Sequence, residues 1–207
     1  MQLQSFPARF LTIVLASALA GAGAAAEPPS VSTRAIVVFN TVCARCHEGE
    51  CSGRLSFDES FARSRGHMAR HYPPAEQQEP LRRGLFTALA YMKDHCAYYP
   101  MPSKVPPGRT WNRDQLESLS TGDDSAWFVP AGRLAPGRYQ LQLDLAADRL
   151  VTVQLTNERF ETAIENCYDS HAGQLRIPFT IDDAGNYYVR LYVRRPVTLT
   201  RLAIRPE

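Results

Sequence analysis

The sequence predicts a chain of two parts, in which a helical part is followed by an all-β, sandwich-like domain. Apolar residues recur at helical spacing between residues 33 and 96, whereas residues 126–206 carry short runs in which apolar and polar residues alternate. The 207 residues are 44% hydrophobic and 21% charged, which is typical of one or two folded domains and not of a disordered chain. We therefore expect a leader over residues 1–26, a helical domain over 27–122 and a β domain over 123–207.

A leader segment precedes both parts. Residues 10–26 are an apolar run that follows Arg9 and ends in three alanines, which is typical of a secretory signal with a small-residue cleavage site. We expect a signal peptide over residues 1–26 and a periplasmic or otherwise exported protein; an uncleaved signal acting as an anchor is the alternative. No later apolar run reaches the roughly 18 residues that span a bilayer, so we expect no integral membrane span after cleavage. A net charge of +2 predicts no binding to nucleic acid.

Two helices are the clearest elements of the first part. Ile36, Phe39 and Val42 lie on one face of a predicted helix that begins near Ser32 or Thr33 and ends near the first cysteines. Behind Pro80, apolar residues repeat at helical spacing as far as residue 96. Shorter helices are expected over 57–70 and over 113–120, where Asn112 and Gln115 form a variant capping box.

The second part has the pattern of short strands. Tyr139, Leu141 and Leu143 alternate with polar residues, and a similar alternation runs from 150 to 155. Residues 188–193 and 197–204 read as further strands, and turn residues such as Pro136-Gly137 separate the runs. Six or seven short strands at this spacing predict a β-sandwich.

The cysteines carry the most specific motif. Residues 43–47 read Cys-Ala-Arg-Cys-His, the C-x-x-C-H attachment pattern of a c-type haem. At this spacing Cys43 and Cys46 can add to the two vinyl groups of the porphyrin, while His47 is placed to bind the iron. The motif occurs once and predicts one covalent haem c. A thioredoxin-like motif should follow a strand, and a zinc ribbon needs a second cysteine pair, so both are disfavoured, as is a strained disulfide.

Three cysteines remain outside this motif, namely Cys51, Cys96 and Cys167. A disulfide between Cys51 and Cys96 is one interpretation, because both lie in the same half of the chain as the motif. Buried free thiols, or a bridge from either of them to Cys167, are the alternatives that spacing leaves open.

Met101 is the candidate for a second iron ligand. Flanking prolines stiffen the loop Tyr-Tyr-Pro-Met-Pro that presents its thioether, and a thioether ligand raises the haem potential in a way that suits an electron carrier. A role as core filler is the alternative for Met101. His67, His71 or His95 could instead supply a second imidazole, or the iron could stay five-coordinate.

Residues 30–120 resemble a class I c-type cytochrome. The resemblance is carried by a helix that leads into Cys-Ala-Arg-Cys-His, by the methionine in Tyr-Tyr-Pro-Met-Pro some fifty residues later, and by a closing helix after it. It implies an all-α haem domain with His47 as proximal ligand, Met101 as distal ligand, and Cys43 and Cys46 as thioether positions. The closing helix is short for this family, and the second half of the chain carries no resemblance that we recognise.

These observations favour an exported mono-haem protein that transfers one electron. Its β domain would dock a redox partner protein, and it would not itself be an enzyme. One alternative is a haem enzyme or gas sensor with open iron coordination, with His71 or His95 as an acid–base group. Another is a binding module whose active part is the β-sandwich, with Tyr187, Tyr188 and Tyr192 as a stacking platform for a glycan or a protein. Motifs of serine and zinc hydrolases do not occur in the sequence.

Overall fold

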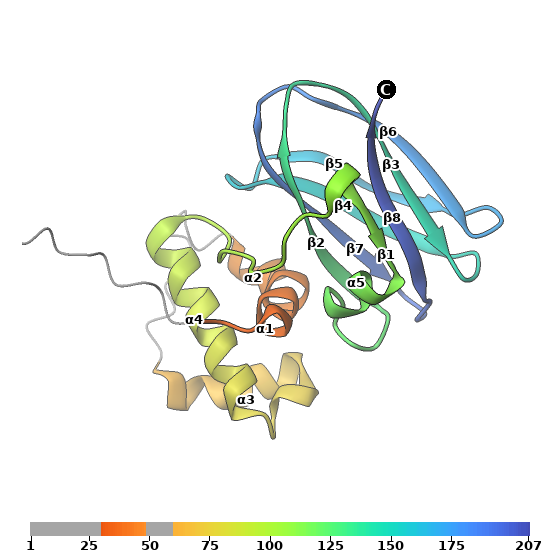
Figure 1. The fold of residues 1–207 in the computed structure, drawn as a ribbon. Coiled ribbons are helices and arrows are strands. Elements are labelled where there is room, and N and C mark those ends of the chain that lie inside the picture. Colours follow the sequence, from red (N-terminus) through yellow and green to blue (C-terminus); the bar gives the residue numbers. More distant parts are fainter. Residues whose placement is uncertain (1–29, 49–59) are drawn as a thin grey trace, which may run out of the picture.

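Two four-stranded antiparallel sheets face each other, and helices pack at one side of them (Figure 1). The structure is a computed structural model and describes residues 30–48 and 60–207. One sheet has the strand order β1-β8-β3-β6 and the other the order β2-β7-β4-β5. The strands are β1 (Thr110–Asn112), β2 (Ala126–Leu134), β3 (Gly137–Leu145), β4 (Leu150–Asn157), β5 (Thr162–Asp169), β6 (Gln174–Ile181), β7 (Gly185–Val193) and β8 (Leu199–Pro206).

The alternation in the sequence explains how the sandwich is filled. In β6, Leu175, Ile177 and Phe179 are buried and the residues between them are exposed, so one face of this strand packs inward and the other meets solvent. The same alternation buries Leu141 and Leu143 of β3. Each such side chain contributes about 1.5–3 kcal/mol through burial, which makes the space between the sheets the main source of stability.

The helical elements lie before the sandwich and between its first strands. The helical run over residues 33–47 is continuous, and α4 is the longest helix, with 17 residues. The elements are α1 (Thr33–Val38), the π-helical turn η1 (Phe39–Cys43), α2 (Ala44–His47), α3 (Phe61–His71), η3 (Pro73–Ala75), α4 (Glu79–His95), η4 (Pro107–Arg109) and α5 (Arg113–Ser118).

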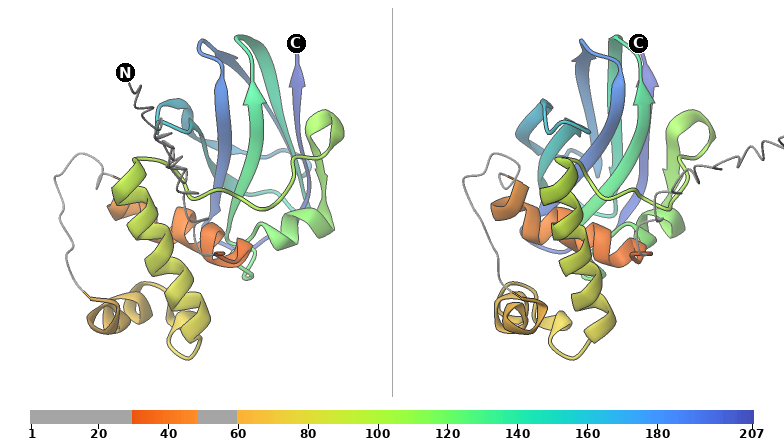
Figure 2. Two further views of the ribbon diagram at one scale, coloured as in Figure 1. Left: turned by 60° about the vertical axis from the view of Figure 1, so that its left-hand side comes forward. Right: turned by 90° about the vertical axis from the view of Figure 1, so that its left-hand side faces the viewer.

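The second half of α1, from Ala35 to Val38, is buried on all sides, whereas Arg34 in its first turn is exposed. Ile36, Val37 and Val38 are all fully buried, although consecutive residues of a helix point in different directions. This is possible because α1 packs against α4 while the following turn η1 contacts β2 and β7. Figure 2 accordingly shows the run from α1 to α2 between α4 and the base of the sandwich.

The prediction of an all-α haem domain ahead of the sandwich is wrong. The predicted closing helix over 113–120 corresponds to α5, which packs against β8, and Trp111 just before it pairs with Leu202 of the same strand, so this segment joins the sandwich instead. The chain is mainly a β-sandwich with short helices. The apolar side chains of the helices join those of the strands in one continuous hydrophobic cluster.

Local capping at α5 follows the predicted pattern. The Asn112 side chain accepts a hydrogen bond of 3.0 Å from the Gln115 backbone N–H, and the Gln115 side chain accepts one of 3.0 Å from the Asn112 N–H. The capping box is therefore confirmed. The boundaries at residues 26 and 122 stay predictions, and the expected signal peptide lies outside the described residues. Within the described part of the chain, no helix is both long and apolar enough to span a membrane.

A tight crossing of α1 and α4 leads to a first prediction. A Cβ atom on Gly84 would lie 2.7 Å from the Cβ of Ala35, whereas a Cβ on Gly66 of α3 would meet no atom within 4 Å. We expect Gly84→Ala to lower the free energy of unfolding by about 1–3 kcal/mol, because the two helices must move apart. The matched control Gly66→Ala should raise it by up to about 1 kcal/mol, since alanine is the better helix former. Urea denaturation measures both, and a Gly84→Ala variant as stable as the control would contradict the tight crossing.

Candidate binding site

A polar groove lies on the outer face of the sheet β2-β7-β4-β5. Its volume is about 720 Å³. The strands β4, β5 and β7 form its floor, and the end of the helical run over residues 33–48 stands beside it. We refer to this site as the groove; it is lined by Arg45, Glu48, Leu150, Thr152, Gln154, Glu165, Cys167, Arg190, Tyr192, Val193 and Arg194.

Strand alternation explains why polar side chains reach the groove. In β4, Val151, Val153 and Leu155 point into the sandwich, which leaves Thr152 and Gln154 on the outer face. Strand β7 likewise buries Val189, Leu191 and Val193 in the sandwich and turns its alternate residues outward.

The register of the three strands arranges the outward residues in two rows. Across the first row, Tyr192 of β7 lies opposite Thr152 of β4, which lies opposite Cys167 of β5. The second row consists of Arg190, Gln154 and Glu165 in the same strand order. Neighbours within a row are about 5 Å apart and the rows are about 6.6 Å apart, so the six side chains form one compact surface.

Hydrogen bonds fix the second row. The Arg190 guanidinium donates to the Gln154 side-chain oxygen at 3.2 Å, and the Gln154 amide nitrogen donates to the Glu165 carboxylate at 2.8 Å. This chain of contacts sets which way the Gln154 amide points. Because its members are already ordered, a ligand meets a surface whose rotamers need little further restriction.

An ion pair with Glu48 anchors Arg190, the member of this row that comes from β7. Its two terminal nitrogens donate to the two Glu48 oxygens at 3.3 and 3.0 Å, and the Arg190 side chain is only 3% exposed. Burial would lower the pKa of Arg190, but hydrogen bonding to Glu48 and the nearby Tyr98 raise it above its ordinary value. The guanidinium therefore remains charged, and Glu48 joins the helical run to the sandwich.

Aromatic side chains cover the other half of the same sheet face. Tyr98 meets Phe128, Phe160 and Tyr188 with ring centroids 5.4, 4.7 and 4.9 Å apart. The Tyr98 hydroxyl donates to Glu48, and burial raises the pKa of Tyr98 well above its usual range, so it stays protonated. These four rings, which we call the aromatic cluster, pack against one another beside the polar groove.

The three tyrosines proposed as a stacking platform do not come together. Tyr187 is buried and donates to the Asp183 carbonyl at 2.8 Å, and Tyr188 lies in the aromatic cluster. Tyr192 does reach the groove, but the Arg45 guanidinium lies over its ring, 4.2 Å from the centroid. Sequence reasoning missed Thr152, Gln154 and Arg190, although the alternation in β4 and β7 was visible.

A second cavity in the helical part brings most of the predicted haem residues together. Cys43, Cys46 and His47 line it from the helical run, and His67 and His71 line it from α3, among mainly apolar side chains. The His47 and His67 rings are 5.9 Å apart and the His67 and His71 rings 4.6 Å. Burial lowers the pKa of His67, as do the neighbouring His71 and His47.

The remaining predicted residues lie elsewhere. Met101 packs half-buried against the core and is not among the residues that line this cavity, and His95 stacks on Tyr91 with ring centroids 4.1 Å apart. Cys51 lies outside the described residues, while Cys96 is exposed and ends α4 with a positive φ of 47°. The Cys51–Cys96 disulfide therefore stays a prediction.

The two cysteines of the motif should differ in reactivity. Burial of its thiol, with Cys46 nearby, raises the pKa of Cys43 to about 12, whereas Cys46 is exposed. Because the thiolate is the reactive form, we expect iodoacetamide to modify Cys46 at least about tenfold faster than Cys43 in the native protein. Peptide mass mapping over time measures both rates. Equal rates would contradict the burial of Cys43, and a lack of reaction at both would mean that both sulfurs are already substituted, as the thioether prediction requires.

Comparisons with known proteins found solved structures of low similarity to this chain. No family model and no curated protein match the chain. A family 35 carbohydrate-binding module from Clostridium thermocellum is 12% identical, with a TM-score of 0.32 over 42% of this chain and 76% of its own. A carbohydrate-binding module from Cellvibrio mixtus lichenase 5A, solved with cellotriose, is 10% identical, with a TM-score of 0.31 over 41% and 73%. A family GH115 4-O-methyl-α-glucuronidase is 12% identical, with a TM-score of 0.34 over 69% and 24%.

These findings correct the resemblance to class I c-type cytochromes. No family model matches the chain, and two four-stranded sheets that include residues 110–112 take the place of the all-α domain that the resemblance implies. Within residues 30–48 and 60–207, no group of three His, Cys, Asp or Glu side chains is placed to hold a metal ion. Together with this resemblance, the predictions of a haem c, of iron binding and of one-electron transfer are wrong. The alternative of a haem enzyme or gas sensor is wrong as well.

None of these findings tests the roles predicted for single residues of the motif and its surroundings. The thioether roles of Cys43 and Cys46, the ligand roles of His47 and Met101, and the redox partner protein stay predictions.

Proposed function

We propose that this chain is a binding module that holds a carbohydrate in the groove of its β-sandwich. The observation that carries the proposal is the ordered second row, in which Arg190, Gln154 and Glu165 are joined by hydrogen bonds at the floor of a groove of about 720 Å³. This volume lies within the range of about 300–1,000 Å³ that is typical of sites for small ligands.

The chemistry of the lining suits hydroxyl groups. A sugar hydroxyl both donates and accepts a hydrogen bond, so it is best met by donors and acceptors that alternate over short distances. The second row offers the Gln154 amide and the Glu165 carboxylate, which the buried Arg190 helps to hold in place, and Thr152 adds a hydroxyl in the first row. Hydrogen bonds to charged groups are roughly twice as strong as those between neutral groups, so the exposed Glu165 carboxylate at the end of the row favours a polar ligand.

An apolar contact complements these polar groups. Leu150 lines the groove and is 44% exposed, which makes it an exposed large hydrophobic side chain among the described residues. The C–H faces of a sugar ring can pack against such a side chain. Because Arg45 covers the Tyr192 ring, the proposal relies on hydrogen bonds and on Leu150 rather than on aromatic stacking.

The proposed ligand also agrees with an exported protein. The predicted signal over residues 1–26 would direct the chain out of the cytoplasm. Structural polysaccharides are found outside the cytoplasm, so the proposed ligand would be accessible there. We therefore propose that the protein acts in the periplasm or beyond it.

Titration calorimetry with a panel of soluble neutral oligosaccharides that includes cellotriose tests this function. We expect at least one of them to bind with a Kd between micromolar and millimolar, or about −8 to −4 kcal/mol. Gln154→Ala should weaken that binding about tenfold or more, because it leaves Arg190 and Glu165 without their shared partner. Gln77→Ala is the matched control, since Gln77 is exposed in the turn before α4 and does not line the groove. The proposal fails if no member of the panel binds, or if the two variants bind alike.

A further inference from the structure

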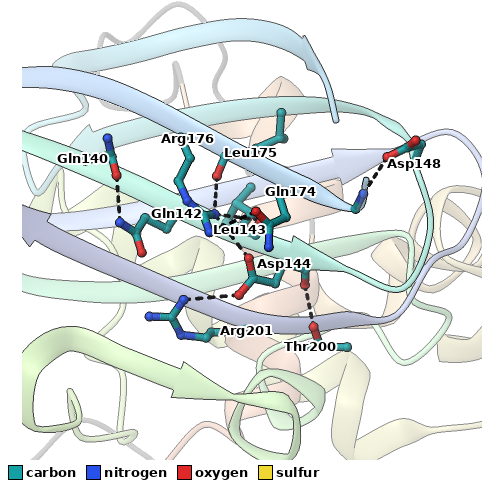
Figure 3. A network of polar contacts seen from close by, with 11 residues as sticks. Gln140, Gln142, Leu143, Asp144, Asp148, Gln174, Leu175, Arg176, Thr200 and Arg201 are labelled. Carbon is teal, nitrogen blue, oxygen red and sulfur yellow. Dashed lines mark hydrogen bonds and ion pairs between the residues drawn. The ribbon is translucent and has the colours of Figure 1, made fainter. Parts of the chain in front are cut away.

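The outer face of the sheet β1-β8-β3-β6 carries a second ordered polar surface. Strand β3 lies between β6 and β8, and Asp144 of β3 lies opposite Gln174 of β6 and Arg201 of β8. Figure 3 shows Arg176 and Arg201 reaching the Asp144 carboxylate from the two neighbouring strands. Their nitrogens lie 3.2 Å from different oxygens of that carboxylate. One carboxylate therefore positions two arginines at the same time.

Further contacts hold this surface in place. The Arg176 guanidinium also donates to the Leu175 carbonyl at 2.9 Å, and the Gln142 amide donates to Gln140 at 2.7 Å. Thr200 donates to the Asp144 carbonyl oxygen at 2.8 Å. These side chains are ordered before any ligand arrives, so little rotamer freedom is lost on binding.

Positive charge exceeds negative charge on these strands. Four arginines face outward, and the carboxylates that pair with them are those of Asp144 and Glu207. Within the described residues, Arg205 has no ion pair, and it is exposed beside Gln140. The four arginines are Arg138, Arg176, Arg201 and Arg205.

The shape and the composition of this face indicate the kind of partner. The outward residues from Gln140 to Asp144 extend about 13 Å along β3, and the three strands span about 10 Å across. Protein interfaces have cores enriched in aromatic residues and depleted in charge, whereas the outward positions of these strands are mainly arginine, glutamine and threonine. An extended polar chain fits this face better than a protein surface does.

We propose that this face binds an anionic polysaccharide, with its arginines holding carboxylate groups and its glutamines holding hydroxyl groups. Arginine is suited to this task because its planar guanidinium can form two parallel hydrogen bonds to one carboxylate. Asp144 keeps Arg176 and Arg201 at a fixed separation, so that two neighbouring acidic groups of the polymer are recognised together. The surface is separate from the groove and does not depend on it.

Binding of soluble polygalacturonate, followed by calorimetry at low and high salt, tests this inference. We expect the wild-type protein to bind, and added salt to weaken binding because exposed charges are screened. The double variant Arg201→Gln/Arg205→Gln should bind at least about tenfold more weakly, which corresponds to about 1.4 kcal/mol. Arg65→Gln, which removes an exposed charge from α3, is the matched control and should change the affinity less than twofold.

Several outcomes would overturn the inference. The first is that polygalacturonate does not bind, and the second is that the double variant binds it as tightly as the wild-type protein. The third is that polyglutamate binds equally tightly, which would indicate an acidic protein as partner. Since Arg201 pairs with Asp144, the single variant Arg205→Gln, whose residue makes no such pair, guards against a folding defect and should weaken binding about threefold. Gln154→Ala should leave polygalacturonate binding unchanged, so failure here and failure of the groove are distinguishable.

Discussion

Replacing Glu48 with glutamine is expected to lower the free energy of unfolding by about 3–5 kcal/mol. Arg190 is almost fully buried, and Glu48 is the carboxylate that faces its two terminal nitrogens. Because the raised pKa of Arg190 keeps it charged, the variant leaves a buried positive charge without its counterion. The helical run over residues 33–48 and the sandwich would also lose a direct connection.

The ion pair between Glu79 and Arg83 provides the matched control. Both side chains are more than half exposed, one turn apart on α4. Glu79→Gln should therefore change stability by no more than about 0.5 kcal/mol. Chemical denaturation of both variants at neutral pH measures the difference, and equal losses would show that the Glu48–Arg190 pair does not hold the two parts together.

The substitution Gly173→Ala is expected to lower the free energy of unfolding by about 3 kcal/mol or more. Gly173 has a φ of +70°, and a Cβ atom there would lie 2.3 Å from the Leu145 carbonyl oxygen. Its N–H donates to Asp148 at 2.6 Å, so the turn before β6 is tied to the turn after β3. Neither backbone segment can move without breaking this contact.

Gly185→Ala is the control for this prediction. Gly185 begins β7 in the same sandwich, and a Cβ there would meet its nearest neighbour, on the Tyr187 ring, at an ordinary distance of 3.7 Å. We expect a change of less than about 1 kcal/mol, measured by thermal or urea unfolding. If Gly173→Ala were tolerated as well as Gly185→Ala, the close approach to Leu145 would be incorrect.

Local patterns in the sequence predicted local structure well. The alternation around Leu141 and Val153 lies in β3 and β4, the repeat behind Pro80 lies in α4, and the Asn112–Gln115 capping box is present. Each of these signals depends only on residues close together in the chain, which is why periodicity and capping rules can detect them.

Contacts between distant residues could not be predicted in this way. Glu48 and Arg190 are 142 positions apart, and Trp111 belongs to a strand of three residues that carries no alternation of its own. The π-helical turn after α1 depends on tertiary packing as well as on Asn40 and Thr41, whose side chains donate to carbonyls four residues earlier. The groove therefore depends on strand register, that is, on which residues of neighbouring strands lie opposite each other, and this cannot be predicted from a single sequence.

The motif at residues 43–47 shows a related limit. A motif of five residues can indicate a candidate site, but it does not determine the fold in which that site lies. The structure brings Cys43, Cys46 and His47 to one cavity, yet it places Met101 elsewhere and gives residues 110–118 to the sandwich. The all-α fold class inferred from this motif was wrong because residues far from the motif, such as Trp111, are buried in the sandwich.

Mapping of backbone amide shifts by NMR during titration with a bound oligosaccharide tests the central claim most directly. If the groove is the carbohydrate site, the largest shifts should fall on Thr152, Gln154, Glu165 and Arg190, and they should disappear in Gln154→Ala. Shifts confined to the helical cavity around Cys43, or a complete absence of shifts with every sugar of the panel, would contradict the account.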